Sequence, residues 1–134
     1  MKINTIVIDP HALQRINTIS KINSHDALRF TKEFSTANEA ILFLEENHVD
    51  LIFLEIDTPN LNGFEFLDLI KTSVGKMPKI VITTKNTDYA FKSYRYDVVD
   101  FLAKPLNESL FQRAVDKVIR FSSFEFLENS WNKI

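Results

Sequence analysis

Short apolar runs alternate with longer stretches of helical periodicity along the chain, and this alternation restricts the folds that the chain can adopt. The apolar runs hold few polar residues, which is typical of strands that helices cover on both faces of a sheet. The runs predicted to be strands are residues 3–8, 28–34, 51–54, 79–83 and 98–103. A parallel sheet in an α/β fold is therefore expected.

A predicted helix follows each predicted strand. Thr36 with Glu39 three residues later predicts a capping box at the second helix. Asn86 or Thr87 is expected to cap the fourth helix, and Asn107 the last. Apolar residues at helical spacing are expected to face the sheet. In the first helix, about residues 11–22, these are Leu13, Ile16, Ile19 and Ile22. In the last helix they are Leu110, Phe111, Ala114, Val115, Val118 and Ile119.

Composition excludes several kinds of function. The chain of 134 residues is long enough for one domain. Its 16 Lys and Arg against 18 Asp and Glu give a net charge of −2, with no basic footprint for nucleic acid or anionic lipid. The absence of Cys excludes thiolate chemistry. The N-terminal segment has the pattern of a strand rather than of a signal peptide, and no apolar run is long enough for a membrane span. We expect a cytoplasmic protein that binds neither membrane nor nucleic acid directly.

Charged residues follow three of the predicted strands. Asp9, Glu55 and Lys104 come directly after the first, third and fifth strands. Because parallel strands end at one edge of the sheet, these residues are expected to share a rim, where open α/β sheets place their sites. Asp57 lies in the turn that follows and is expected to be a turn former. With only two Gly the chain has no Gly-rich phosphate loop, so independent enzymatic activity is not expected.

The order of the elements and the residues at the strand ends resemble the receiver domain of two-component response regulators. Residues 50–65 hold the strand, the acid at the acceptor position, the proline and the glycine of that family in register. Residues 89–105 look most like the receivers of LytTR-type regulators. The resemblance implies a flavodoxin-like (βα)5 fold with a parallel sheet in the order 2-1-3-4-5. It covers residues 3 to about 120, and residues 1–120 are expected to form the receiver domain.

The resemblance assigns a switch and a pocket. Thr83 matches the hydroxyl residue that ends the fourth strand, and Phe101 matches the aromatic switch residue. Lys104 matches the pocket lysine, and Pro105 the proline that usually follows a cis peptide bond.

The acidic residues depart from the family pattern. Glu55 stands where the family has its phosphorylatable Asp, and Pro10 stands where a second acid would follow Asp9. The resemblance gives Asp9, Glu55 and the backbone carbonyl of Asp57 as metal ligands. Because Mg²⁺ needs several oxygen ligands, the missing carboxylate predicts weak Mg²⁺ binding. The added methylene of Glu55 is expected to disfavour in-line phosphoryl transfer.

Two interpretations of Glu55 are open. Its carboxylate could be a permanent substitute for a phosphorylated Asp, paired with Lys104 and accepting a hydrogen bond from Thr83. It could instead belong to a static scaffold in which the pair with Lys104 neutralises a disused pocket. The rival hypothesis is a conventional receiver that is phosphorylated on Glu55 or Asp57. A further alternative is that the chain is the receiver part of a LytTR-type DNA-binding regulator.

For both interpretations of Glu55, we expect the chain to function through contacts with other proteins. The partner implied by the resemblance is a histidine kinase or another signalling protein. A homodimer is expected through the fourth helix, fifth strand and fifth helix, where basic and acidic residues are mixed. Residues 121–134 hold Phe121, Phe124, Leu127 and Trp131 at helical spacing. This segment is expected to extend the last helix, to pack on the domain or to meet a partner.

Overall fold

A parallel five-stranded sheet forms the centre of the protein, in the order β2-β1-β3-β4-β5. The computed structural model describes the backbone of residues 2–132 and the side chains of residues 2–122. The strands are β1 (Ile3–Ile8), β2 (Leu28–Phe34), β3 (Leu51–Leu54), β4 (Lys79–Thr84) and β5 (Asp100–Ala103). The helices are α1 (Ala12–Asn23), α2 (Ala37–Glu46), α3 (Gly63–Ser73), α4 (Tyr89–Ser93), the 3₁₀ turn η1 (Tyr94–Tyr96) and α5 (Glu108–Asn132). The predicted flavodoxin-like fold and strand order are confirmed.

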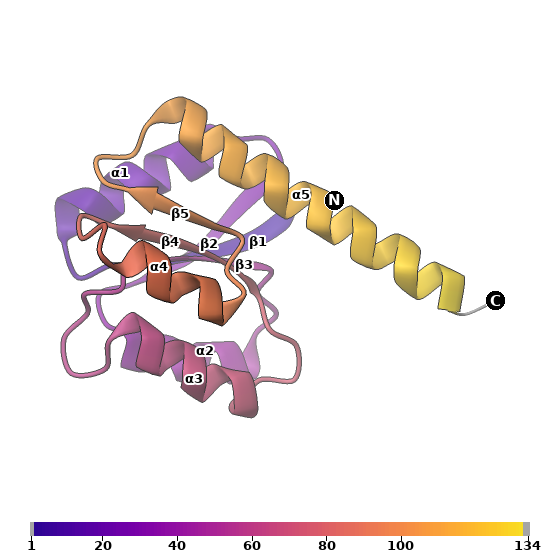
Figure 1. Ribbon diagram of the computed structural model, residues 1–134, viewed down its shortest axis with the longest axis horizontal. Coiled ribbons are helices and arrows are strands. Elements are labelled where there is room, and N and C mark those ends of the chain that lie inside the picture. The colour runs from indigo at the N-terminus through magenta and orange to yellow at the C-terminus, as the bar shows by residue number, and fades with distance from the viewer. Residues whose placement is uncertain (1, 133–134) are drawn as a thin grey trace.

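Helices cover both faces of the sheet (Figure 1), which explains why the central strand β3 is apolar and buried throughout, whereas the edge strand β2 has exposed polar residues. On one face α1 and α5 pack over a cluster that includes Ile22, Phe53 and Phe111. The rings of Phe53 and Phe111 stack with their centroids 5.3 Å apart. On the other face α2, α3 and the α4–η1 segment pack over a second cluster, built around Leu54 and Phe66. Successive residues of a strand point to opposite faces of the sheet and therefore pack in different clusters.

The predicted inward face of α1 is confirmed for Ile19 and Ile22 and wrong for Leu13 and Ile16. Leu13 and Ile16 are 82% and 58% exposed, whereas Ile22 is buried as expected. The helix turns Gln14 and Arg15 toward the sheet edge instead, where their side chains bind groups at the ends of the strands. Hydrogen bonding at the rim, rather than apolar periodicity, sets the rotation of the first turns of α1.

The apolar stripe predicted for α5 is too wide. Leu110 and Ile119 are 37% and 36% exposed. The residues of the stripe that are buried are Phe111, Ala114, Val115 and Val118. Both exposed residues lie at the margins of the stripe, because a single helix can present only about a third of its circumference to the sheet.

Helix caps fix where α2 and α3 begin. The Thr36 hydroxyl accepts a hydrogen bond from the Glu39 N–H, as predicted, although no return bond from the Glu39 side chain is present among the described residues. The complete capping box is at α3, where Asn62 accepts from the Glu65 N–H and the Glu65 carboxylate accepts from the Asn62 N–H. This box places the start of α3 directly after the β3–α3 loop.

The predicted cap of α4 is wrong. The N-cap residue is Asp88, and it makes no side-chain capping bond. The helix is only 5 residues long and continues into η1. Asp97 then turns the chain with φ of 55°.

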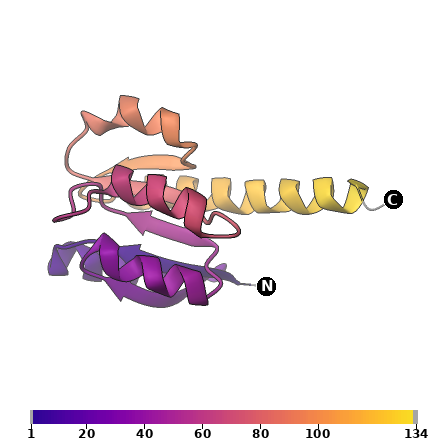
Figure 2. The ribbon, with the colours of Figure 1, turned by 90° about the horizontal axis from the view of Figure 1, so that it is seen from below.

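Helix α5 is the longest element, with 25 residues, and its last turns extend away from the domain (Figures 1 and 2). The side chains of Phe124, Leu127 and Trp131, which were expected to pack or to meet a partner, lie outside the described residues. Among the described residues, no helix has the length and apolar character needed to span a membrane.

Candidate functional site

The ends of β1, β3 and β5 bring two carboxylates and one ammonium together. The Lys104 Nζ donates hydrogen bonds to Asp9 Oδ2 at 2.5 Å and to Glu55 Oε1 at 2.9 Å. Its third donor reaches Gln14 Oε1, on α1, at 2.7 Å. A protonated lysine has three N–H groups, so all of them are used here. The rim predicted for Asp9, Glu55 and Lys104 is therefore present as a direct ionic contact.

This cluster is buried. The side chains of Asp9, Glu55 and Lys104 are 1%, 3% and 3% exposed. Two negative charges share one positive charge in a site from which water is largely excluded, so each ionic contact is stronger than it would be at the surface. The cluster holds an excess of negative charge at the position where a phosphoryl group would add more.

Backbone N–H groups bind the remaining carboxylate oxygens. Asp9 Oδ1 accepts from the His11 N–H at 2.9 Å, and Glu55 Oε2 accepts from the Asp57 N–H at 3.0 Å. Both carboxylates are thus held on both oxygens. The Asp57 N–H fixes the longer Glu55 side chain across the start of the β3–α3 loop.

The donor set does not fit a resident Mg²⁺ ion. Lys104 and two backbone N–H groups bind the four oxygens of Asp9 and Glu55. Pro10 contributes no side-chain oxygen, and the described residues contain no group of three or more side chains suited to a metal. A cation would have to displace Lys104 before it could reach octahedral coordination.

Gln14 and Arg15 are parts of the site that the sequence reasoning missed. Gln14 receives the third Lys104 hydrogen bond, and Arg15 donates from Nη1 to the Asp9 carbonyl oxygen at 2.7 Å. Arg15 also pairs with Glu33 at 2.7 Å. The only signal in the sequence was a polar pair inside an otherwise amphipathic helix, directly after the first strand.

The two threonines that end β4 face opposite sides of the sheet. Thr83 pairs with Leu102, which belongs to the cluster under α1 and α5. Thr84 lies on the same side as Phe101, which packs against the cluster under α2 and α3. Glu55 follows Leu54 and Thr83 follows its partner Ile82, so Thr83 lies beside Glu55, whereas Phe101 lies on the opposite face of the sheet. The Thr84 hydroxyl accepts from the Asn86 N–H at 3.3 Å.

Asp57 links the acceptor loop to α4. Its Oδ1 accepts a hydrogen bond from the Tyr89 hydroxyl at 2.7 Å. This hydrogen bond is the main cause that raises the pKa of Tyr89 above its usual value, with burial and the charges of Asp57 and Glu55 adding to it. The Tyr89 ring packs edge-on against Phe64, at 5.6 Å between centroids. The bond between Lys104 and Pro105 is cis, as predicted.

Known proteins share this architecture. Residues 5–116 match the response regulator receiver domain family. A response regulatory protein of Yersinia pestis is 27% identical, over 98% of this chain and 53% of that protein. The sensory transduction protein LytT of Enterococcus faecalis is 23% identical, over 97% of this chain and 53% of that protein. The chain thus spans about half the length of these curated relatives.

Solved structures agree in fold. The response regulatory domain of protein mrkE from Klebsiella pneumoniae has a TM-score of 0.75 at 25% identity, covering 98% of this chain and 100% of that one. The REC domain of AraT from Geobacillus stearothermophilus has a TM-score of 0.80 at 20% identity, covering 93% and 98%. Because the family match extends over most of the chain, this protein belongs to the response regulator receiver domain family of two-component signal transduction.

Proposed function

We propose that this receiver signals without accepting a phosphoryl group, and that the Glu55 carboxylate permanently supplies negative charge at the acceptor position. Receiver domains are signalling folds that interact with histidine kinases and other signalling proteins. The observation that carries the proposal is the buried contact of Lys104 with both Asp9 and Glu55. In this arrangement the lysine already pairs with the charge at the acceptor position.

Phosphoryl transfer at this site faces two physical obstacles. Mg²⁺ normally neutralises charge on the transferring group, and here Pro10 replaces one of its carboxylate ligands. The Glu55 oxygens are also shifted by about one methylene and are held by Lys104 and the Asp57 N–H. A shift of about 1 Å in a reacting atom can lower the rate by roughly 100-fold.

Incubation with acetyl phosphate and Mg²⁺, followed by intact-mass measurement, tests the proposal. We expect no phosphoryl adduct on the unchanged protein. The Pro10→Asp/Glu55→Asp double variant, which restores both missing groups, is expected to gain one. An adduct on the unchanged protein, located on Glu55 or Asp57, would support the conventional phosphoaccepting receiver instead.

The switch residues support a fixed signalling state. Phe101 is turned against the cluster under α2 and α3, on the same face as Thr84. We propose that the Glu55 charge favours this arrangement through Thr83, which lies beside Glu55 at the end of β4. A charge can shift such an equilibrium only by interacting differently with its two states. Glu55→Gln should therefore change the NMR signals of the Phe101 ring, whereas a static scaffold would leave them unchanged.

The output surface that we propose lies on α4, β5 and α5. Phe91 and Tyr94 on the α4–η1 segment are 78% and 84% exposed. Asp100 on β5 binds Arg113 at 2.8 Å and Lys117 at 3.5 Å, both on α5. Apolar side chains beside paired charges form a surface suited to a symmetric dimer. We propose that residues 1–120 form the receiver and that residues 121–134 are a C-terminal extension of it, of which residues 121–132 belong to α5.

A further inference from the structure

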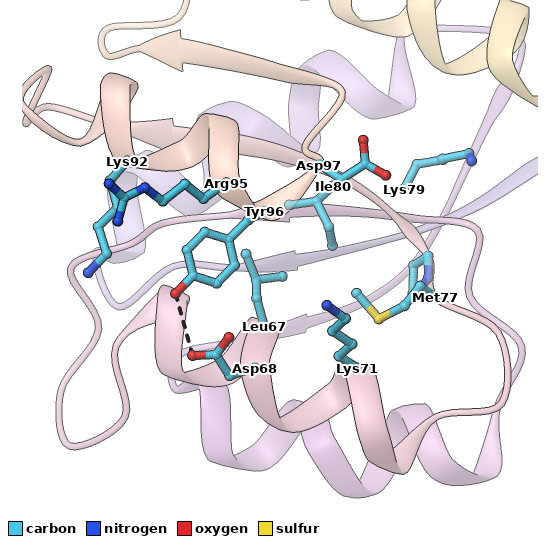
Figure 3. Close-up of a pocket in the computed structure, with 11 residues that line it drawn as sticks. Leu67, Asp68, Lys71, Met77, Lys79, Ile80, Lys92, Arg95, Tyr96 and Asp97 are labelled. Carbon is cyan, nitrogen blue, oxygen red and sulfur yellow. Dashed lines mark hydrogen bonds between the residues drawn. The ribbon is translucent and has the colours of Figure 1, made fainter.

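A groove opens at the end of the sheet opposite Glu55. It lies between α3 and the α4–η1 segment, above the start of β4, and has a volume of about 470 Å³ (Figure 3). Ile80, in its floor, pairs with Ile52 near the start of β3, whereas Glu55 follows the end of that strand. The groove is therefore separate from the cluster around Lys104.

The floor of the groove is apolar. Leu67 and Ile80 are both buried, at 3% exposure each, and Met77 and the Tyr96 ring complete the lining. The Tyr96 hydroxyl donates to Asp68 Oδ2 at 3.4 Å, so the ring is held along one wall. Inorganic ions would gain nothing from such a floor, but an organic group would remove apolar surface from water.

The rim of the groove is mainly cationic. Its cationic residues are Lys71, Lys79, Lys92 and Arg95, and its acids are Asp68 and Asp97. The local balance is positive, although the chain as a whole carries −2. Figure 3 shows Lys71 rising from α3, with Lys92 and Arg95 on the opposite side.

Two of these cations are available to a ligand. Lys71 and Arg95 form no ion pair or hydrogen bond with another side chain in the described part of the chain. The Lys92 ammonium lies over the Phe64 ring, with Nζ 4.6 Å from the ring centroid, and this cation–π contact already engages it. Asp68, one of the two acids at the rim, already accepts a hydrogen bond from the Tyr96 hydroxyl.

We propose that this groove binds a small organic anion with an apolar body, such as an aromatic carboxylate or sulfonate. The apolar part lies on Leu67, Ile80 and the Tyr96 ring, and the anionic group lies at the rim beside Lys71, with Arg95 adding positive charge from the opposite wall. The volume falls within the range of small-molecule sites, roughly 300–1,000 Å³. Since one wall is α3 and the other is η1, an occupied groove fixes the distance between these two elements. The inference does not depend on whether Glu55 is phosphorylated.

The test uses 1-anilinonaphthalene-8-sulfonate as the probe. Titration is followed by fluorescence, and ¹H–¹⁵N NMR shift changes locate the bound probe. We expect saturable binding, with shift changes concentrated at α3, η1 and the start of β4. N-phenyl-1-naphthylamine, which has a similar body without the charge, should bind about tenfold more weakly, because one charge contact is worth about 1.4 kcal/mol.

Variants separate this groove from general surface binding. Lys71→Gln/Arg95→Gln should weaken sulfonate binding at least tenfold and leave the neutral analogue within about twofold. Arg29→Gln is the matched control, since it removes an exposed charge from β2, at the far edge of the sheet. Dispersed NMR spectra of all variants verify that they are folded. Shift changes elsewhere, equal binding of the neutral analogue, an equal loss in Arg29→Gln, or no saturable binding would each overturn the proposal.

Discussion

A single buried lysine controls the charge of the candidate site. Replacing Lys104 by Met would leave the carboxylates of Asp9 and Glu55 buried without a cation. Removing one partner of a buried ionic group costs about 3–5 kcal/mol. We therefore expect Lys104→Met to lower the free energy of unfolding by that amount, measured by urea denaturation followed by circular dichroism.

The control for this variant is a surface ion pair. Lys21 pairs with Glu108 at 2.9 Å, and the Glu108 side chain is 72% exposed. Exposed pairs contribute about 0–1 kcal/mol, so Lys21→Met should change the free energy of unfolding by less than about 1 kcal/mol. Equal effects of the two substitutions would contradict the account of the buried cluster.

The hydrogen bond from Tyr89 to Asp57 predicts a pH-dependent contribution to stability. The pKa of Tyr89 in the folded protein is raised above its ordinary value of 10.0, mainly by this bond. A raised folded-state pKa means that the contribution is fully present below pH 10 and is lost as the pH rises through the folded-state pKa. Tyr89→Phe should therefore lower the free energy of unfolding by about 1 kcal/mol at pH 8.

This difference should shrink above pH 10, where the unchanged protein loses the bond. Denaturant unfolding of both proteins at pH 8, 9, 10 and 11 measures the difference. The pKa of Tyr96 is also raised, mainly by burial and then by the charge of Asp68. Tyr96 is present in both proteins, so its contribution does not affect the difference between them. A difference that stays constant to pH 11 would rule out the linkage.

At the scale of residues, the sequence predicted the charged groups of the site but not their neutral partners. Asp9, Glu55 and Lys104 were predictable because parallel strands end at a common edge. Gln14 was not, because a glutamine in a helix usually faces solvent and only the position of Lys104 gives it a buried partner. Thr83 was assigned from the family resemblance, and the strand register places it beside Glu55.

At the scale of elements, the start of α3 depends on Gly63. A Cβ atom at this position would lie 2.7 Å from Ile56 Cδ1 and 2.9 Å from Ile56 Cα. The second contact is with backbone, which cannot move aside without shifting the β3–α3 loop. We expect Gly63→Ala to lower the free energy of unfolding by about 1–3 kcal/mol, measured by thermal and denaturant unfolding.

Gly75→Ala provides the matched control, because a Cβ atom there would meet nothing within 4 Å. Its effect should stay within about 0.5 kcal/mol. A destabilisation by Gly75→Ala as large as that by Gly63→Ala would show that the general cost of replacing glycine, and not the contact with Ile56, is responsible.

The elements also show why some boundaries could be predicted and others could not. The N-cap of α2 was readable from Thr36 and Glu39, since the cap depends on local sequence alone. The start of α4 could not be predicted, because Asp88 makes no side-chain cap. This segment is held instead by the packing of Tyr89 and Tyr96 on Phe64. Tertiary contacts also set the orientation of the first turns of α1, where Gln14 and Arg15 bind groups at the rim and Leu13 and Ile16 are exposed.

At the scale of the whole molecule, the order of the strands could be predicted because strands and helices alternate along the chain. The next prediction concerns self-association. We expect the protein to self-associate through the α4–β5–α5 surface, with Phe91 and Tyr94 at the contact. Phe91→Lys/Tyr94→Lys should shift the equilibrium to monomer by placing like charges across the symmetry axis. Sedimentation equilibrium at several concentrations measures this shift.

Leu42→Lys is the control for assembly. Leu42 is 63% exposed on α2, outside the proposed surface. The substitution Leu42→Lys should leave the association constant unchanged. A protein that is monomeric at all concentrations, or one that Leu42→Lys dissociates equally well, would contradict the proposed interface.

Because α5 is long, a small tilt at its base produces a larger displacement at its end. Its 25 residues, at about 1.5 Å each, give a rod of about 37 Å, and Phe111, Ala114, Val115 and Val118 pack it on the domain. Tilting such a rod by about 10° at its base moves its tip by about 6 Å. A change at the β5–α5 junction too small to disturb the core would therefore be magnified at the far end of the rod, where a neighbouring molecule could detect it.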